Sequence, residues 1–415
     1  MRFNFYTHLR FTMRLFGTFL RPSTGVRNIS SLVLPETHSK LKNVCREFSE
    51  AELRPIAATL DKEQMYPSDQ IKKLADLGIL GVVVDKKYGG SGADSLALSI
   101  AVEEISRCCG GTGSIVSIHN ALYAGILNKV GTPEQKLQFL PDFIGRGIVG
   151  CFALSEPGSG SDAANMHTIA KREGNQWVLN GTKAWVTNGI EGGAIIVMAR
   201  SDVFKGHKGV SAFIVPTNSP GLTRGKRDDK LGIRAASSCN IILDNVVVPA
   251  ENMLGNEGDG FKIAMAGIDL ARIGIASQAL GISQAAMDCA IDYAGNRTAF
   301  GNAIIKLSAV QQRLAKMATR LEASRLLTWK AAWLRDNNLP FTKAASMAKL
   351  DASQTATYIT HNCIQILGGM GYISDMPAER HYRDARITEI YAGPTDIQYL
   401  VIAEKLAKEY GYKTR

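Results

Sequence analysis

The 415-residue sequence predicts an α+β fold, because helical patterns at both ends of the chain flank a region of short β patterns. Helix signals run from about residue 36 to 149, and β-rich runs separated by Gly, Pro and Asp follow up to about residue 250. Helical periodicity returns from about residue 257. We therefore expect an N-terminal helical domain at 33–149, a middle antiparallel β domain at 150–256 and a C-terminal helical domain at 257–415.

Two segments support the first helical domain. Thr132–Gln135 combines an N-cap threonine, proline at the first helical position and glutamine at the third, which predicts a capping box. Ser95–Cys108 carries apolar residues on a helical period, and its Glu103 and Glu104 are expected to face solvent.

The middle region alternates as β-strands do. Gln176–Asn180 and Thr182–Thr187 flank an Asn-Gly pair, which predicts a hairpin turning at Asn180-Gly181. Further strands are expected at Ala194–Ala199, Val210–Pro216 and Asn240–Val248.

The C-terminal region suits a helical bundle, because apolar residues repeat at alternating spacings of three and four along 306–337. These residues are Leu307, Val310, Leu314, Met317 and Leu321. No glycine-rich run has the context of a dinucleotide-binding Rossmann fingerprint.

The net charge of +10 is concentrated at the start of the chain, where residues 1–31 hold five arginines and no acid. This Arg-rich, acid-free start with interleaved Phe and Leu is typical of a mitochondrial transit peptide, which we place at 1–32. The remaining charge forms no basic block, which disfavours nucleic-acid binding. No stretch approaches 18 uninterrupted apolar residues, so no membrane span is expected.

The seven cysteines form no CxxC pair and no Cys/His metal spacing. We expect reduced thiols that mostly fill the core, and no metal site.

Four segments carry residues suited to chemistry, in the order 151–162, 181–188, 267–272 and 365–386. Each alone has an ordinary structural interpretation: a Gly/Ser loop, a core tryptophan, a surface ion pair or a helix terminus. Together, in this order on an α–β–α chain, they resemble the acyl-CoA dehydrogenase family from about residue 36 to 410. The runs 230–234, 274–281 and 376–380 resemble its short-chain, butanoyl-CoA-type branch.

The resemblance implies a flavoprotein of the mitochondrial matrix with a C-terminal four-helix bundle. Such an enzyme dehydrogenates an acyl-CoA thioester in fatty-acid or branched-chain amino-acid oxidation, passes electrons to an electron-transfer flavoprotein and forms a homotetramer.

The resemblance also implies FAD-binding residues in several segments. An indole face suits a flavin ring, an arginine fork suits a pyrophosphate, and glycines allow close backbone approach. The implied residues are Phe152, Ala153, Leu154, Ser155, Gly160, Ser161, Trp185, Val186, Thr187, Gln365, Gly368, Gly369, Thr395 and Asp396, with Arg297 and Phe300 reaching the FAD of a neighbouring subunit.

For the acyl-CoA, the resemblance implies contacts from Ser161, Asp269, Arg272, Tyr391 and Gly393. Asp269 and Arg272 are three residues apart and share a helix face. A purely structural ion pair between them is the alternative.

The residue that acts as catalytic base in most family members is a glutamate at the position of Ala392. In a minority it lies at the position of Ala271, so both positions are alanine here. An alanine methyl group accepts no proton, whereas the reaction requires a positioned carboxylate. Glu389 and Asp396 are weak substitutes, and an ion pair with the nearby arginines suits Glu389 better.

Three hypotheses remain open from the sequence. The chain is a working dehydrogenase with another base, a non-catalytic member that binds FAD or acyl-CoA or assembles with an active relative, or an enzyme with altered flavin chemistry. Replacing Ala392 by glutamate discriminates between the first two.

Overall fold

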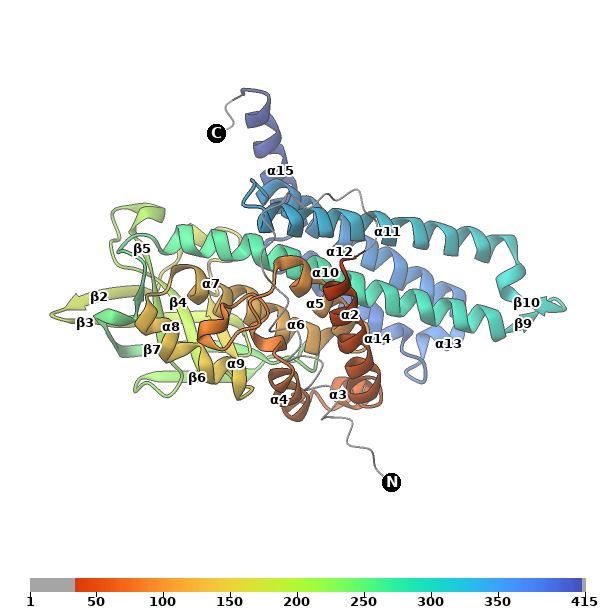
Figure 1. The fold of residues 1–415 in the computed structure, drawn as a ribbon, viewed down its shortest axis with the longest axis horizontal. Coiled ribbons are helices and arrows are strands. Elements are labelled where there is room, and N and C mark those ends of the chain that lie inside the picture. The colour runs from red at the N-terminus through yellow and green to blue at the C-terminus, as the bar shows by residue number, and fades with distance from the viewer. Residues whose placement is uncertain (1–33, 413–415) are drawn as a thin grey trace.

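The computed structural model describes residues 34–412 of the chain, so the predicted transit peptide lies outside the described residues. The β domain and a bundle of long helices lie at opposite ends of the molecule, and the N-terminal helices pack between them (Figure 1). This order confirms the predicted α+β architecture.

The N-terminal region contains eight described α-helices. They are α2 (Glu36–Phe48), α3 (Ala57–Lys62), α4 (Ser68–Asp76), α5 (Ser95–Ser106), α6 (Gly110–Ile118), α7 (Gly125–Val130), α8 (Pro133–Phe139) and α9 (Pro141–Gly145). The capping box is confirmed at α8. The Thr132 backbone amide donates to Gln135 Oε1 at 2.9 Å, and the Gln135 amide donates to the Thr132 hydroxyl at 3.2 Å.

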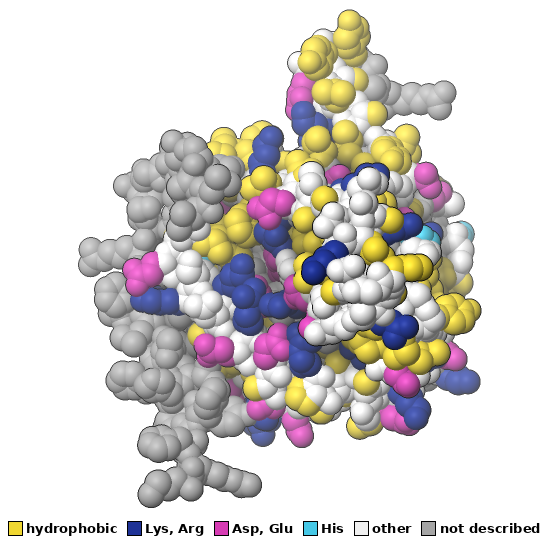
Figure 2. Space-filling view, turned by 90° about the vertical axis from the view of Figure 1, so that its right-hand side faces the viewer, with side chains coloured by type: hydrophobic (Ala, Val, Ile, Leu, Met, Phe, Trp, Pro, Cys, Tyr) yellow, Lys and Arg dark blue, Asp and Glu magenta, His cyan; other side chains and the backbone are white. Residues whose placement is uncertain are grey.

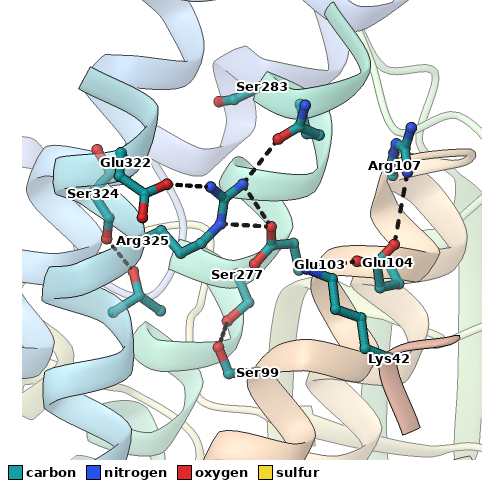
Figure 3. Close-up of polar contacts among 12 residues, drawn as sticks. Lys42, Ser99, Glu103, Glu104, Arg107, Ser277, Ser283, Glu322, Ser324 and Arg325 are labelled. Atoms are coloured by element: carbon teal, nitrogen blue, oxygen red, sulfur yellow. Dashed lines mark hydrogen bonds and ion pairs between the residues drawn. The ribbon is translucent and has the colours of Figure 1, made fainter. Parts of the chain in front are cut away.

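The expectation that Glu103 and Glu104 face solvent is wrong. Both side chains are buried, and both carboxylates bind arginines from other helices. Figure 3 shows the contact between Glu103 and Arg325. Arg325 donates to Glu103 at 2.9 and 3.0 Å, and Arg46 donates twice to Glu104 at 2.9 Å. These arginines are remote in sequence, so periodicity within one helix did not reveal them.

The β domain is an eight-stranded sheet. Its strands are β1 (Gly150–Ala153), β2 (Ile169–Glu173), β3 (Gln176–Thr187), β4 (Ala194–Arg200), β5 (Val210–Pro216), β6 (Leu222–Arg227), β7 (Ser238–Pro249) and β8 (Met253–Leu254). The strand order is β6-β7-β3-β2-β4-β5-β8, and β1 lies beside β4. Most pairs are antiparallel as predicted, but β4 pairs in parallel with β1 and with β2.

The predicted hairpin turn at Asn180-Gly181 is also wrong. β3 continues through this pair and forms a ladder with β7 from Gln176 to Thr187, with a register shift around Gly181. Gly181 has φ +151°, and a Cβ there would lie 2.4 Å from Thr168 Oγ1. Glycine therefore serves a β-bulge and a close contact at this position. The turn lies instead between β2 and β3, at Gly174 and Asn175.

The C-terminal region consists of α10 (Gly260–Asn296), β9 (Thr298–Ala299), β10 (Asn302–Ala303), α11 (Ser308–Asp336), α12 (Thr342–Leu367), α13 (Gly369–Tyr372), α14 (Ala378–Arg386) and α15 (Thr395–Glu409). Helices α10, α11 and α12 pack against one another, and the predicted seam of α11 buries Leu314, Met317 and Leu321 in their shared core. The fourth long helix, α15, contacts α12 and then projects from the body (Figure 1).

Within residues 34–412, α10 is the one helix long and apolar enough to cross a membrane by length and composition. However, 83% of its most apolar window is buried inside the protein, as in the core helix of a bundle. The same residues hold no cluster of three or more metal-ligating side chains, and all seven cysteines are free thiols.

Candidate active site

The loop that follows β1 is held by a buried ion pair. Lys183 Nζ on β3 donates to Glu156 Oε1 at 2.8 Å and to the Leu154 carbonyl at 3.1 Å. The Glu156 carboxylate also accepts from the backbone amides of His167 and Thr168, at 2.6 and 2.9 Å. Although burial opposes ionisation, Lys183 and these donors lower the pKa of Glu156 to about 2. The sequence analysis did not identify these contacts of Glu156 and Lys183, which we call the clamp.

The clamp leaves one side of the loop open. Gly160 and Ser161 are exposed, and a Cβ on Gly160 would meet no atom within 4 Å. Phe152 and Ser155 are half-buried, whereas the side chains of Ala153 and Leu154 point into the cores and can serve a ligand only through their backbone.

Strand β3 presents an aromatic face at its C-terminal end. Trp185 is 59% exposed and has φ +55°, although the flanking Val186 side chain is buried. Thr187 is half-buried beside it. An exposed indole next to a hydroxyl fits the apolar ring and polar edge of a flavin. These residues therefore fit the isoalloxazine part of FAD.

A second group of predicted FAD residues lies at the far end of the bundle. Arg297 and Phe300 belong to the turn around β9, where Phe300 is 91% exposed. Gln365, Gly368 and Gly369 lie where α12 passes into α13, and no atom lies within 4 Å of a Cβ built on either glycine. β9 and the sheet lie at opposite ends of the molecule (Figure 1). One copy of the chain thus does not bring the two groups together.

The predicted pair on α10 forms a buried ion pair. Arg272 Nη1 lies 2.8 Å from Asp269 Oδ1, and their side chains are 7% and 15% exposed. Asp269 Oδ2 accepts from the Thr342 hydroxyl at 2.6 Å, and Arg272 Nη1 also donates to the Ser346 hydroxyl at 3.1 Å. Burial lowers the pKa of Arg272 from its ordinary value. The structural role of this pair is therefore present, although not at the surface.

The segment 391–393, which we call the base loop, is held through its backbone. Ala392 has φ +52° and Gly393 has φ +95°. Lys349 Nζ on α12 donates to the Gly393 carbonyl at 2.8 Å. Gln398 Nε2 donates to the same carbonyl at 2.7 Å and to the Ala392 carbonyl at 3.3 Å.

The remaining residue of the base loop, Tyr391, donates its hydroxyl to Gln278 Oε1 on α10. The sequence analysis identified neither Gln278 nor Lys349 as a partner of the base loop. One signal was available for Lys349, since it occurs in a helix among the small residues Ala345, Ala348 and Ala352, which all share the buried face.

The two acids considered as substitutes for the base, Glu389 and Asp396, have different surroundings. Glu389 accepts from the Thr357 hydroxyl and lies 2.7 Å from Arg386, so it forms the ion pair that its neighbourhood predicted. Asp396 is exposed in the first turn of α15, next to Thr395, whose hydroxyl lies 3.4 Å from the Glu389 carbonyl. Glu389 is thus engaged by a hydroxyl and a cation, whereas Asp396 faces solvent.

Comparison with known proteins assigns the family. Models of the N-terminal, middle and C-terminal domains of acyl-CoA dehydrogenases match residues 35–146, 151–246 and 258–407. The chain belongs to the acyl-CoA dehydrogenase family. It is 55% identical over 398 residues to the mitochondrial short-chain specific acyl-CoA dehydrogenase of Mus musculus, covering 94% of this chain and 97% of that protein. The human counterpart is 56% identical over 380 residues, covering 92% of each chain.

The fold agrees with that of a solved acyl-CoA dehydrogenase. Butyryl-CoA dehydrogenase of Megasphaera elsdenii superposes with a TM-score of 0.89 at 39% identity, covering 91% of this chain and 99% of that one. Acyl-CoA dehydrogenases are FAD-dependent oxidoreductases, and the exposed indole and open glycines described above fit that cofactor.

Proposed function

We propose that the chain is a mitochondrial FAD protein that binds a short or short branched acyl-CoA and dehydrogenates it slowly. The observation that carries the proposal is that the base loop is fully held in place while its base is absent. The backbone of Ala392 and Gly393 is bonded by Lys349 and Gln398, so the site is built without a proton acceptor.

Trp185 and Arg272 have separate roles in the proposed reaction. Bound FAD supplies the acceptor for the hydride that leaves the β-carbon. Trp185 provides the face on which the flavin ring packs, and Arg272 provides a buried positive charge near the base loop. The α-proton has to leave to a weak acceptor such as water. Loss of a general base costs roughly 10² to 10⁴ in rate.

The experiment is an anaerobic titration of FAD-loaded protein, begun at residue 33, with butanoyl-CoA. We expect an immediate shift of the flavin spectrum on binding, followed by bleaching far slower than turnover of an active relative. Absence of any spectral change with acyl-CoAs of two to eight carbons would refute acyl-CoA binding. Immediate complete bleaching would show that another group acts as an efficient base.

The second candidate is a non-catalytic family member that binds acyl-CoA or assembles with an active relative. Alanine at both positions favours this candidate, because neither Ala392 nor Ala271 can act as the catalytic base. A stable spectral shift with no bleaching over hours would support this candidate. Recovery of a mixed oligomer after co-expression with a short-chain relative would identify the assembly role.

We also propose a homotetramer. The two groups of predicted FAD residues lie at opposite ends of the folded molecule, so a neighbouring subunit has to supply Arg297 and Phe300. Hydrophobic side chains line the projecting α15 (Figure 2), where Leu400 is 65% exposed and Tyr399 is 51% exposed. Burial of such surface stabilises association. Light scattering tests the mass, and a monomer that retains FAD would refute the shared site.

The electron acceptor and the compartment belong to the same proposal. The Arg-rich start supports import into the matrix, where an electron-transfer flavoprotein would reoxidise the reduced flavin. Import of a fluorescent fusion of residues 1–33 into mitochondria tests whether this segment is a targeting signal. Reoxidation of the photoreduced protein by an electron-transfer flavoprotein tests the partner separately from the slow chemical step.

A further inference from the structure

The Arg272 guanidinium carries a buried donor without a partner. Its Nη1 donates to Asp269 and Ser346, whereas its buried Nε has no hydrogen-bond partner among residues 34–412. Nη2 lies 3.6 Å from the position that a Cβ on Gly393 would take, so the Nε–Nη2 edge faces the base loop. Buried donors of a charged group are rarely left unpaired in folded proteins. The Nε–Nη2 edge is therefore prepared for a ligand.

The surroundings of this edge carry an excess of positive charge. The Lys349 side chain is fully buried, and its ammonium donates to a neutral carbonyl rather than to a carboxylate. Burial and the charge of Arg272 lower the pKa of Lys349 to about 7, although Glu389 opposes the shift. The nearby acids have other partners, since Asp269 binds Thr342 as well as Arg272, and Glu389 pairs with Arg386.

We propose that the Nε–Nη2 edge of Arg272 is a carboxylate-binding site beside Ala392, with Lys349 adding positive charge. The two donors of this edge are parallel and match the two oxygens of one carboxylate. Gly393 is the base-loop residue nearest to Nη2, and its neighbour Ala392 brings no acid of its own. Chloride, which lacks two linked oxygens, fits the fork less well.

The carboxylate has two possible sources. It is either a free small anion such as acetate, or the terminal carboxylate of an acyl chain carried by CoA. Only the second source rests on the proposed function, because it requires the acyl chain to reach the base loop. Binding of acetate requires no turnover, so the site and the dehydrogenase activity are tested separately.

The first arm of the test compares sodium acetate with sodium chloride at equal ionic strength on the FAD-loaded full chain. We expect a saturable rise in melting temperature of a few degrees with acetate alone, and broadening of the ¹³C-acetate carboxyl resonance. Arg272→Lys keeps the charge without the fork and should abolish both effects. Because that variant disturbs the buried ion pair with Asp269 and can fail to fold, Ala392→Glu is the second variant. Its tethered carboxylate should also abolish acetate binding.

The second arm compares glutaryl-CoA with pentanoyl-CoA, which have equal chain lengths and differ in a terminal carboxylate. Calorimetry should show glutaryl-CoA binding at least about tenfold more tightly if the acyl chain supplies the anion, and Ala392→Glu should remove this preference. Acetate binding without the preference assigns the site to free anions. Equal effects of acetate and chloride together with equal affinities for the two thioesters would overturn the proposal, whether or not butanoyl-CoA bleaches the flavin.

Discussion

Replacing Ala392 by glutamate is the change that most directly tests how this site works. The backbone of residue 392 already has a positive φ of +52° with a Cβ attached, so an unbranched longer side chain adds little backbone strain. The loop bonds from Lys349 and Gln398 reach carbonyl groups and do not depend on the side chain at 392. The buried charges of Arg272 and Lys349 favour an ionised carboxylate there.

The expected gain follows from general-base catalysis. A positioned base contributes roughly 10² to 10⁴ in rate, which corresponds to about 3 to 5 kcal/mol of barrier. The flavin and acyl-CoA residues need no rebuilding in the variant, because the loop already has its conformation. We therefore expect reduction of the flavin by butanoyl-CoA to accelerate by at least about 100-fold.

The assay is anaerobic stopped-flow absorption of the flavin with saturating butanoyl-CoA. Ala392→Gln is the matched control, because it has the same shape as the glutamate variant and lacks the proton-accepting carboxylate. Equal acceleration by glutamine and glutamate would refute the base interpretation. So would a glutamate variant that binds butanoyl-CoA, as judged by its spectral shift, and reduces its flavin no faster than the unmodified protein.

Three further predictions follow from individual contacts. Because the folded-state pKa of Lys349 is about 7, below the ordinary value of about 10.4, the unfolded chain binds more protons between these pH values. Burial of the charged ammonium destabilises the fold fully below pH 7, and this cost falls as the folded protein loses the proton. The free energy of unfolding of the wild type relative to Lys349→Met should therefore rise from pH 7 to 10 in urea unfolding. A constant difference would contradict this. Trp185→Ala should weaken FAD affinity about tenfold by fluorescence titration, with Trp185→Phe intermediate; unchanged affinity would place the flavin elsewhere. Arg325→Met should lower the free energy of unfolding by about 3 to 5 kcal/mol because it leaves Glu103 buried without its partner. Adding Glu103→Leu should recover most of the loss, and calorimetry of both variants measures the two changes.

Local signals in the sequence predicted the fold where short-range contacts decide it. The capping box at Thr132 and Gln135 involves neighbouring residues, and it formed as expected. Asn180-Gly181 was misassigned because β7, some 60 residues later, pairs with β3 on both sides of the glycine and turns the expected hairpin into a bulge. Glu103 was assigned to solvent because its partner Arg325 lies on a helix more than 200 residues away.

The candidate site divides in the same way. Motifs identified Trp185 and the base loop, since resemblance depends on residues that occur in recognisable runs. The supporting residues Lys349 and Gln398 lie outside the motifs, and Gln278 lies in a run that indicated only the family branch. Their role becomes visible only when α10, α12 and α15 meet around the loop. The Nε–Nη2 edge of Arg272 belongs to this second class, because it is defined by the atoms that surround it.

The identity of residue 392 is separable from the structure that presents it. The hydrogen bonds that Lys349, Gln278 and Gln398 make to the base loop end on a backbone carbonyl or on Tyr391, so alanine and glutamate are compatible with the same loop. A change at residue 392 therefore need not reduce stability, and overall likeness to acyl-CoA dehydrogenases does not by itself set the rate of turnover. Since the loop, the flavin face and Arg272 persist together, binding and chemistry are governed by different atoms in this protein. Ala392→Glu should accordingly change the rate of flavin reduction without lowering the melting temperature of the FAD-loaded protein by more than about 1 °C, a loss that corresponds to less than about 1 kcal/mol for a protein of this size.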